Sequence, residues 1–398
     1  MKTNMMTVIT ALIWVLVPSS ALALGTPKPV AVQGPKAWTY LVYLDGDNNL
    51  DSWGDYSLNL MKNGLSDDAN VNVIVLDDHY GSGAHLLQVT SSGITTISDY
   101  GEPDLADPAV LQNFLSWGVQ NYPADHYAVV LWDHGGGWKD VIFDATSNDR
   151  MLISDLSNAM RTVTTSLHHK FDVTIFDACL MSMAEVADQL RPVTNYLVAS
   201  EQSVPDEGFP YDTMLQQLSA QPSMDSWAYS KQIADDYYNF FINTHGKSVL
   251  SVSAIDESKL PGLVSAVDNL SVSLIANLAT YHGQVESARS NAQHQIEGIN
   301  GTFWYVDLHN FADQIALRVN DATIDGQATA VSATIESSLY ERHSHNLDGK
   351  AYGIAVNFPP NLPQYEDKTY LAQNYQGVNL VFTAETHWDE MLLEYYNH

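Results

Sequence analysis

Hydrophobic and polar positions near the start of the chain predict a strand, a helix and a second strand. The runs WTYLVYL (residues 38–44) and VNVIVL (71–76) are apolar and rich in β-branched or aromatic residues, and acidic turn-forming residues follow each. Between them, residues 50–65 carry apolar side chains at helical spacing. Two strands joined by a helix of this length are typical of a βαβ unit with parallel strands.

The same alternation continues to about residue 255. HLLQVTSSGITTI (85–97) predicts a hairpin, and residues 109–119 predict a helix. Short apolar runs, typical of strands buried in the centre of a sheet, occupy residues 127–132, 173–176, 196–199 and 249–255. The pattern therefore predicts an α/β sandwich, in which helices cover both faces of a mostly parallel central sheet.

After residue 255 the pattern becomes mainly helical. Residues 263–278 and 328–340 have apolar positions at helical spacing, whereas YGIAVNF (352–358) predicts a strand. We therefore expect a main domain over residues 38–255 and a C-terminal helical extension over residues 256–398 that returns a strand to the sheet.

Residues 1–23 have the pattern of a secretory signal peptide. A basic start is followed by an apolar stretch over residues 5–17 and by Ala-Leu-Ala at 21–23. The apolar stretch is too short to favour a permanent membrane anchor. Residues 24–37, rich in Pro and Gly, predict an N-terminal arm. We expect a secreted or periplasmic protein without a stable membrane anchor.

The charge balance excludes one class of ligand. The chain has 47 acidic and 17 basic side chains, for a formal net charge of −30. Phosphate binding needs a surplus of Lys and Arg, so we expect no nucleic-acid partner. The acidic surface could concentrate cationic ligands or divalent ions. It could equally reflect solubility or a salty environment.

Two candidate catalytic residues follow two of the predicted central strands. They are the single cysteine, Cys179, and His134, which precedes three glycines. DHGGGW (133–138) comes after residues 127–132, and DACLM (177–181) comes after residues 173–176. The carboxyl ends of parallel strands are where open α/β sheets build their sites. A neighbouring imidazole can activate a thiol as a nucleophile. Cys179 is therefore a candidate nucleophile and His134 its candidate general base.

The residues after each candidate support the same chemistry. Residues 180–190 have helical spacing and predict that Cys179 lies at a helix N-terminus, which lowers a thiol pKa. The glycine run lets a substrate carbonyl approach the backbone, so the N–H groups of Gly135 and Cys179 could form an oxyanion hole. The alternatives are a structural histidine in a tight turn and a buried, inert thiol.

The chain resembles the clostripain family of cysteine peptidases, relatives of caspases, gingipains and legumains. The resemblance lies in WTYLVYLDGDNNLD (38–51), LWDHGGGW (131–138), FDACLMSMAEVA (176–187), SEQSVPDEGFPYD (200–212), SVSAIDESKL (251–260) and YVDLHNFADQI (305–315). It implies a caspase-like three-layer fold, a dyad of His134 and Cys179, and an oxyanion hole near Gly135 and Cys179. It also implies that DGDNN (45–49) shapes the edge of the active site.

The resemblance further implies cleavage after Arg or Lys in protein or peptide substrates. Acidic residues would bind the basic side chain, and the matching positions are Asp177, Asp206 and Glu207. The family's loop often reads PGDGW, whereas this chain has PDEGF at 205–209, so the choice of acid stays open. The alternative is that these acids cap turns on an acidic surface.

Self-cleavage between the two motifs is also implied by the resemblance. Of the two basic residues in the segment 139–150, Arg150 stands in a polar, turn-forming stretch, and we predict cleavage after it. No cofactor is required for the chemistry. The resemblance makes calcium possible, but DGDNN followed by Leu50 departs from an EF-hand loop, so no ligand is assigned.

Two other functions remain open. A peptidase with a different specificity, for Asp or Asn, would need a basic or polar pocket, whereas residues 200–212 supply acids. A catalytically silent caspase-like binding or surface protein would keep the fold without the chemistry. A serine hydrolase is disfavoured because the chain lacks a G-x-S-x-G motif.

Overall fold

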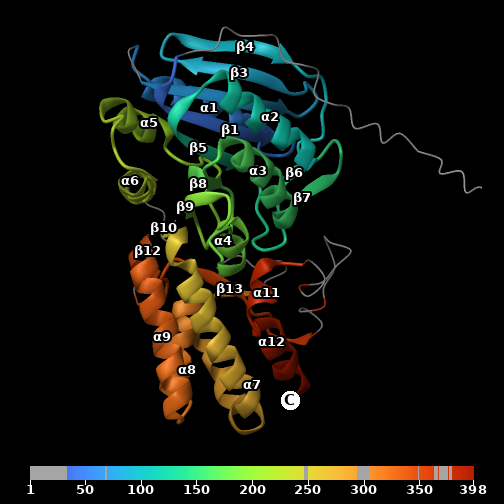
Figure 1. Cartoon of the computed structure of the whole chain (residues 1–398), viewed down its shortest axis with the longest axis vertical. Coiled ribbons are helices and arrows are strands. Elements are labelled where there is room, and N and C mark those ends of the chain that lie inside the picture. The colour runs from blue at the N-terminus through green and yellow to red at the C-terminus, as the bar shows by residue number, and fades with distance from the viewer. Residues whose placement is uncertain are drawn as a thin grey trace, which may run out of the picture.

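The computed structural model describes residues 34–67, 70–245, 250–293, 304–347, 349–362, 366, 375 and 379–398. The predicted signal peptide (1–23) and most of the predicted N-terminal arm (24–37) lie outside these residues. In the described part of the chain, an α/β layer structure lies at one end of the long axis and long helices lie at the other (Figure 1).

Parallel strands form the centre of a nine-stranded sheet within the described residues. In spatial order these are β2 (Val71–His79), β1 (Lys36–Gly46), β5 (Ala124–Trp132), β8 (Phe171–Asp177) and β9 (Thr194–Ala199). Antiparallel strands complete both edges: β3 (His85–Thr90) and β4 (Gly93–Asp99) beyond β2, and β10 (Ser251–Asp256) and β12 (Leu339–His343) beyond β9. The parallel centre explains why these strands read as continuous apolar runs, since both of their faces are buried.

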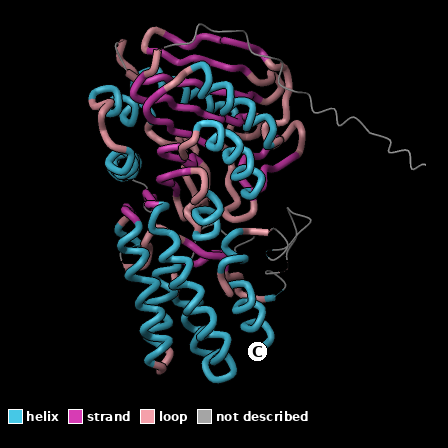
Figure 2. Tube along the Cα trace, viewed as in Figure 1, coloured by secondary structure: helices cyan, strands magenta, loops and turns pink. Residues whose placement is uncertain are grey.

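Helices cover both faces of this sheet, as Figures 1 and 2 show. One face carries α1 (Asp51–Gly64), α5 (Tyr211–Ala220) and α6 (Ser226–Asn239), which continues into a π-helical turn at Phe240–His245. The other face carries α2 (Pro108–Asn121), α3 (Ile153–Leu167) and α4 (Ala184–Leu190). A short hairpin, β6 (Asp140–Asp144) and β7 (Asp149–Leu152), lies between β5 and α3 in the sequence. The predicted α/β sandwich is thereby confirmed.

The C-terminal part is mainly helical, as expected. It contains a short turn at Glu257–Lys259, α7 (Leu260–Asn291), α8 (Leu308–Arg318), α9 (Ala322–Ser338), a short turn at His345–Leu347, α11 (Val381–Glu385) and α12 (Trp388–Asn397). The helix expected over residues 328–340 ends at Ser338, where the chain becomes β12 and joins the large sheet beside β10. The strand expected over residues 352–358 is β13 (Ala355–Asn357), which pairs with β11 (Tyr305–Asp307) in a separate two-stranded sheet.

One helical stretch of the described residues, Glu257–Asn291, is long and apolar enough to cross a membrane by length and composition. Core helices of soluble proteins meet the same criterion. Here Leu263, Val267, Leu270 and Leu274 are buried and pack with α8, α9 and α12. This burial is typical of a core helix, and the expectation of no stable membrane anchor stays a prediction.

Buried carboxylates gather where β1 and β2 end. Asp45 and Asp78 face each other across the two strands, and both side chains are fully buried. Within the described residues, one carboxylate oxygen of each has no hydrogen-bond partner. Burial raises the pKa of Asp78 to about 8, and the nearby Glu102, Asp144 and Asp47 carboxylates add to this effect.

The raised pKa of Asp78 predicts that the protein loses stability as the pH rises. The folded protein keeps a proton that the unfolded chain, with an ordinary pKa of about 4, has lost, so the free energy of unfolding falls between about pH 4 and 8. Asp78→Asn cannot titrate. We expect this variant to lose less unfolding free energy between pH 5 and 8, by at most about 1.4 kcal/mol per pH unit.

Denaturant unfolding at several pH values measures this difference. Asp125→Asn, at the exposed second residue of β5, is the matched control and should follow the parent protein. Equal slopes for all three proteins would show that Asp78 ionises normally in the folded state.

Candidate active site

The register of β5 and β8 brings the two predicted motifs together. Trp132 and Asp177, the last residues of these parallel strands, lie opposite each other. The two chains stay in contact just beyond this pair, because the Asp133 N–H donates to the Asp177 carbonyl at 3.2 Å. His134 and Cys179 therefore leave the sheet at the same edge, as the motif positions predicted.

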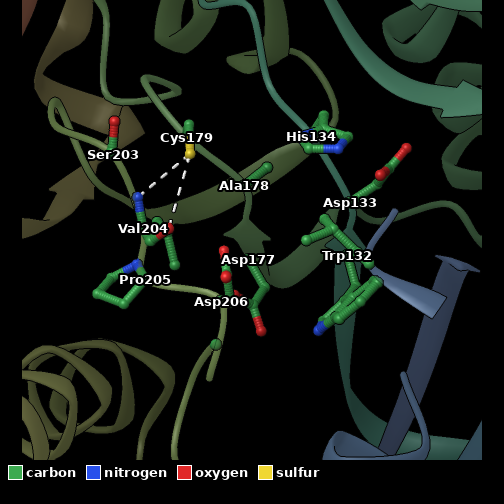
Figure 3. A pocket seen from close by; sticks show the side chains of 12 residues that line it. Trp132, Asp133, His134, Asp177, Ala178, Cys179, Ser203, Val204, Pro205 and Asp206 are labelled. Atoms are coloured by element: carbon green, nitrogen blue, oxygen red, sulfur yellow. Dashed lines mark hydrogen bonds between the residues drawn. The ribbon is translucent and has the colours of Figure 1, made fainter. Parts of the chain in front are cut away.

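His134 and Cys179 line one pocket of about 230 Å³ (Figure 3). Its lining residues are Leu50, Trp132, Asp133, His134, Asp177, Ala178, Cys179, Ser203, Val204, Pro205, Asp206 and Gly208. Figure 3 shows Asp177 and Asp206 together, below the level of Cys179 and His134. The pocket thus combines a thiol, an imidazole and the three carboxyl groups of Asp133, Asp177 and Asp206, from three separate segments of the chain.

The glycine run permits this close approach of the two loops. A Cβ on Gly135 would overlap the carbonyl oxygen of Cys179. Gly137 has a φ of +71°, and a Cβ there would lie 2.5 Å from the sulfur of Met183. Larger residues at either position would push the His134 and Cys179 loops apart, which explains why this sequence has glycine there.

His134 is held by a residue that the sequence analysis did not assign. Its Nε2 lies 2.9 Å from Oδ1 of Asn49, in the turn after β1. Because a carbonyl oxygen accepts, Nε2 carries the proton, and Nδ1 of the neutral ring keeps a lone pair. The neighbouring Asn48 donates from Nδ2 to Oδ1 of Asp133 at 2.8 Å. The DGDNN stretch thus contacts both residues at the start of the histidine motif.

Electrostatics favour the neutral form of His134. Burial lowers the pKa of the His134 imidazole, the Arg150 guanidinium lowers it further, and the Asp206 carboxylate opposes both. At neutral pH the ring is therefore unprotonated and can accept a proton.

Cys179 lies in a turn, so the prediction that it starts a helix was wrong. The helix α4 begins at Ala184, after Leu180 has reversed the chain direction with a φ of +69°. This conformation is held by the Leu180 N–H, which donates to the carbonyl of Gln202 at 3.1 Å. Helical spacing over residues 180–190 correctly indicated α4, but its first residues, 180–183, lie before the helix begins.

The Cys179 thiol contacts the loop that follows β9. The N–H of Val204 donates to the sulfur at 3.3 Å, and the thiol donates to the carbonyl of Val204 at 3.7 Å (Figure 3). The half-buried sulfur therefore faces the pocket wall formed by residues 203–208. A backbone N–H directed at sulfur stabilises negative charge on it.

Of the three predicted pocket acids, the structure brings two into the pocket. Asp177 is buried, and its Oδ2 accepts from the Phe209 N–H at 3.0 Å and from the Tyr211 hydroxyl at 2.7 Å. Burial raises the pKa of Asp177 to about 6. Asp206 is exposed at the pocket, whereas Glu207 is half-buried and is not among the lining residues.

Gly208 explains how the acidic loop reaches the base of the pocket. It has a φ of +67°, and a Cβ on it would lie only 2.6 Å from Oδ2 of Asp177. Glycine is the residue that tolerates both this conformation and this contact.

The predicted self-cleavage residue does not lie in a turn. The turn occupies residues 145–148, and Arg150 follows it within β7, where its neighbour Met151 is buried. The Arg150 guanidinium lies 4.2 Å from the centre of the Phe143 ring and 3.5 Å from Asp140. The other basic residue of the segment, Lys139, is buried over the Trp304 ring.

No metal centre can be assigned from the geometry. In the part of the chain that the structure describes, no group of three or more His, Cys, Asp or Glu residues is arranged to hold a metal ion. Asp45 and Asp47, from the acidic stretch considered for calcium, instead accept hydrogen bonds from nearby backbone N–H groups. The residues do not fit a calcium site in this arrangement, and calcium binding stays a prediction.

The chain belongs to the clostripain family, whose family model matches residues 42–396. It is similar to clostripain from Hathewaya histolytica, with 27% identity over an alignment length of 341 and with 69% of this chain covered. The match spans 61% of the length of clostripain, less than two thirds of that relative.

Solved structures share the fold. A secreted cysteine protease from Bacteroides thetaiotaomicron, in complex with an irreversible peptide inhibitor, matches with a TM-score of 0.67 and 23% identity, covering 90% of this chain and 100% of that one. An inactive zymogen protease from Parabacteroides distasonis matches with a TM-score of 0.66 and 22% identity, covering 89% of this chain and 99% of that one. The predicted family and the predicted fold are both confirmed.

The contact between Asn49 and His134 predicts a titration shift. Asn49→Asp keeps an oxygen acceptor beside Nε2 and adds a negative charge, which favours the protonated ring. We expect the pKa of His134 to rise by about one unit or more.

NMR titration of the imidazole Cε1–H signals measures this shift, with His134→Gln identifying the resonance. Asn59→Asp is the control, because Asn59 lies on the exposed surface of α1 and bonds within its own helix. An unchanged His134 titration in Asn49→Asp would mean that Asn49 does not hold the ring in solution.

Proposed function

We propose that this chain is a secreted cysteine endopeptidase that cleaves peptide bonds after Arg or Lys. Cys179 is the nucleophile and His134 is the general base. The observation that carries the proposal is the meeting of the one thiol of the chain and a neutral, oriented imidazole in one pocket that is also lined by Asp177 and Asp206.

In the first half of the reaction the thiol proton passes to Nδ1 of His134, and the sulfur attacks the carbonyl carbon of the substrate. The carbonyl oxygen becomes negatively charged in the tetrahedral intermediate. His134 then donates its proton to the leaving amine, the C–N bond breaks, and an acyl group remains on the sulfur. In the second half His134 takes a proton from water, which attacks the acyl group, and the thiol is restored as the acid product leaves.

The N–H groups of Gly135 and Cys179 stabilise the oxyanion in this mechanism. Gly135 forms a bridge with Val141, but the two hydrogen bonds of that bridge use the Gly136 N–H and the His134 carbonyl. The Gly135 N–H is thus not used by the bridge. Gly135 packs directly on the Cys179 carbonyl, so the two residues that supply these donors are in contact.

The acids of the pocket select the substrate side chain. A buried carboxyl group, Asp177, and an exposed one, Asp206, both line the pocket and suit a long basic side chain whose charge reaches into it. A guanidinium or ammonium near Asp177 would offset the burial that raises the pKa of this carboxyl, so the acid ionises when a basic residue enters. Glu207 is the least favoured of the three acids because it does not line the pocket.

Secretion and processing complete the proposal. The pattern of residues 1–23 is that of a secretory signal, and one structural relative is described as secreted. Arg150 is the better of the two processing positions, because its side chain is half-exposed whereas Lys139 is buried. Cleavage after Arg150 requires the β6–β7 hairpin to open, since this bond lies in a paired strand.

The central experiment compares the mature chain with Cys179→Ala under reducing conditions, with and without calcium. Both are assayed on short peptides ending in Arg, Lys, Asp or Asn before a reporter group. We expect turnover after Arg or Lys that Cys179→Ala abolishes. Silence on all four peptides from a folded and processed protein would favour a binding protein that kept the fold, and turnover after Asp or Asn would contradict the pocket assignment.

Asp206→Asn and Glu207→Gln separate the roles of the neighbouring acids. The first should raise KM for Arg and Lys peptides by about 10-fold or more, the cost of losing one charged partner. The second should leave KM within about twofold. The opposite order would assign the pocket to Glu207.

Self-cleavage predicts a defined pair of fragments. After incubation, intact-mass measurement should find two fragments from cleavage of the Arg150–Met151 bond in the parent chain. The same measurement should find one uncut chain in Cys179→Ala. Arg150→Ala should stay uncut, whereas Lys139→Ala should still be cut. A parent chain that is active while uncut would overturn this prediction without touching the proposed peptidase activity.

A further inference from the structure

The glycine run beside His134 depends on contacts from outside its own loop. Three consecutive glycines have more backbone freedom than any other tripeptide, so they do not hold a fixed N–H direction by themselves. The described structure supplies contacts from β6 and from the C-terminal part. From β6, the carbonyl of Asp140 accepts from the Gly136 N–H at 2.9 Å.

From the C-terminal part, Tyr305 in β11 contacts the same glycines. Its hydroxyl donates to the carbonyl of Gly136 at 2.6 Å. Its ring lies against the next residue, because a Cβ on Gly137 would be 2.6 Å from a carbon of the Tyr305 ring. Tyr305 is buried, and its ring is thus fixed over the glycine run. Gly136 is therefore held at both ends, by Asp140 and by Tyr305.

The small sheet that carries Tyr305 also holds the cysteine loop. β11 pairs with β13, and the Ala355 N–H of β13 donates to the carbonyl of Ser182 at 2.8 Å. Met183, the residue before α4, forms a parallel bridge with Ala355. One two-stranded sheet from the C-terminal part therefore contacts the loops of both proposed catalytic residues.

We propose that Tyr305 is a positioning residue for the Gly135 N–H. The Ile142 N–H donates to the His134 carbonyl at 3.2 Å and holds the peptide unit that contains the Gly135 N–H. The Tyr305 hydroxyl holds the Gly136–Gly137 peptide unit, so that the glycine run cannot shift and the Gly135 N–H stays directed at the oxyanion. The proposal rests on the proposed peptidase function. Tyr305 is not among the residues that line the pocket of His134 and Cys179. A phenylalanine would fill the same space, so what the tyrosine adds is one donor to a backbone carbonyl that would otherwise be free to rotate.

Tyr305→Phe tests the proposal because it keeps the ring and removes only the hydroxyl. Misdirection of one oxyanion donor should lower kcat by about 10-fold or more and leave KM within about twofold. A peptide aldehyde, which forms an oxyanion on the thiol, should bind more weakly by a similar factor. Alkylation of Cys179 by iodoacetamide, which needs no oxyanion hole, should keep its rate.

Tyr43→Phe is the matched control. Tyr43 is also fully buried, and its hydroxyl likewise donates to a loop carbonyl, that of Leu105, at 2.7 Å. Both variants should lose similar thermal stability, but only Tyr305→Phe should lose kcat and aldehyde affinity. Equal kcat in all three proteins, or equal losses in both variants, would overturn the positioning role.

Hydrogen exchange separates failure of this proposal from failure of the proposed function. Backbone amides of residues 133–138 should exchange faster in Tyr305→Phe than in Tyr43→Phe, whether or not the protein cleaves peptides. Unchanged exchange would refute the positioning role even in an active enzyme. Faster exchange in a protein without Cys179-dependent activity would support the contact and reject the peptidase assignment.

Discussion

The close contact between the loops after β5 and β8 is the constraint on which the rest of the site depends. The parallel register places Trp132 opposite Asp177, and the backbone bond from Asp133 to Asp177 continues the pairing beyond the strands. Gly135 then packs on the Cys179 carbonyl, with no room for a side chain between them. Distances of this kind are set by backbone geometry, which is stiffer than any side-chain contact.

Buried carboxyl groups lie at the same edge of the sheet as this contact, at the ends of β8 and β2. Asp177 accepts two hydrogen bonds, and its pKa still rises to about 6 because burial disfavours the charge. The pKa of Asp78, at the far side of β1, rises to about 8, since other carboxylates lie near it. The chain therefore keeps several acids partly protonated inside the fold. A cationic side chain entering the pocket would favour the ionised form of Asp177.

The C-terminal part is integral to the site. It was expected as a helical extension that returns a strand to the sheet, yet β11 and β13 contact both loops that carry the candidate dyad. Lys139, directly after the histidine motif, also lies over the Trp304 ring of this part at 3.7 Å. Removing these residues would leave the glycine run without a partner on one side, so the main domain is not expected to hold its site alone.

The sequence by itself determined the class of fold, the family and the position of the candidate dyad. Apolar runs report burial on both faces, and residues after such runs fall at one edge of a parallel sheet, so His134 and Cys179 were predictable from local pattern. The resemblance then narrowed the pocket acids to Asp177, Asp206 and Glu207. Tertiary structure alone separated Glu207 from the other two, because neighbours in sequence can face different ways in a loop.

Tertiary structure also decided the contacts made across the chain. Asn49 meets His134, and Tyr305 meets Gly136, over separations that carry no periodic signal. The structure places Cys179 in a turn, because the helix that was expected to begin there begins only at Ala184. It places Arg150 in a paired strand of the β6–β7 hairpin and not in the turn before that strand. Local pattern records which residues are buried, whereas the partners of a polar group depend on which distant segments the fold brings beside it.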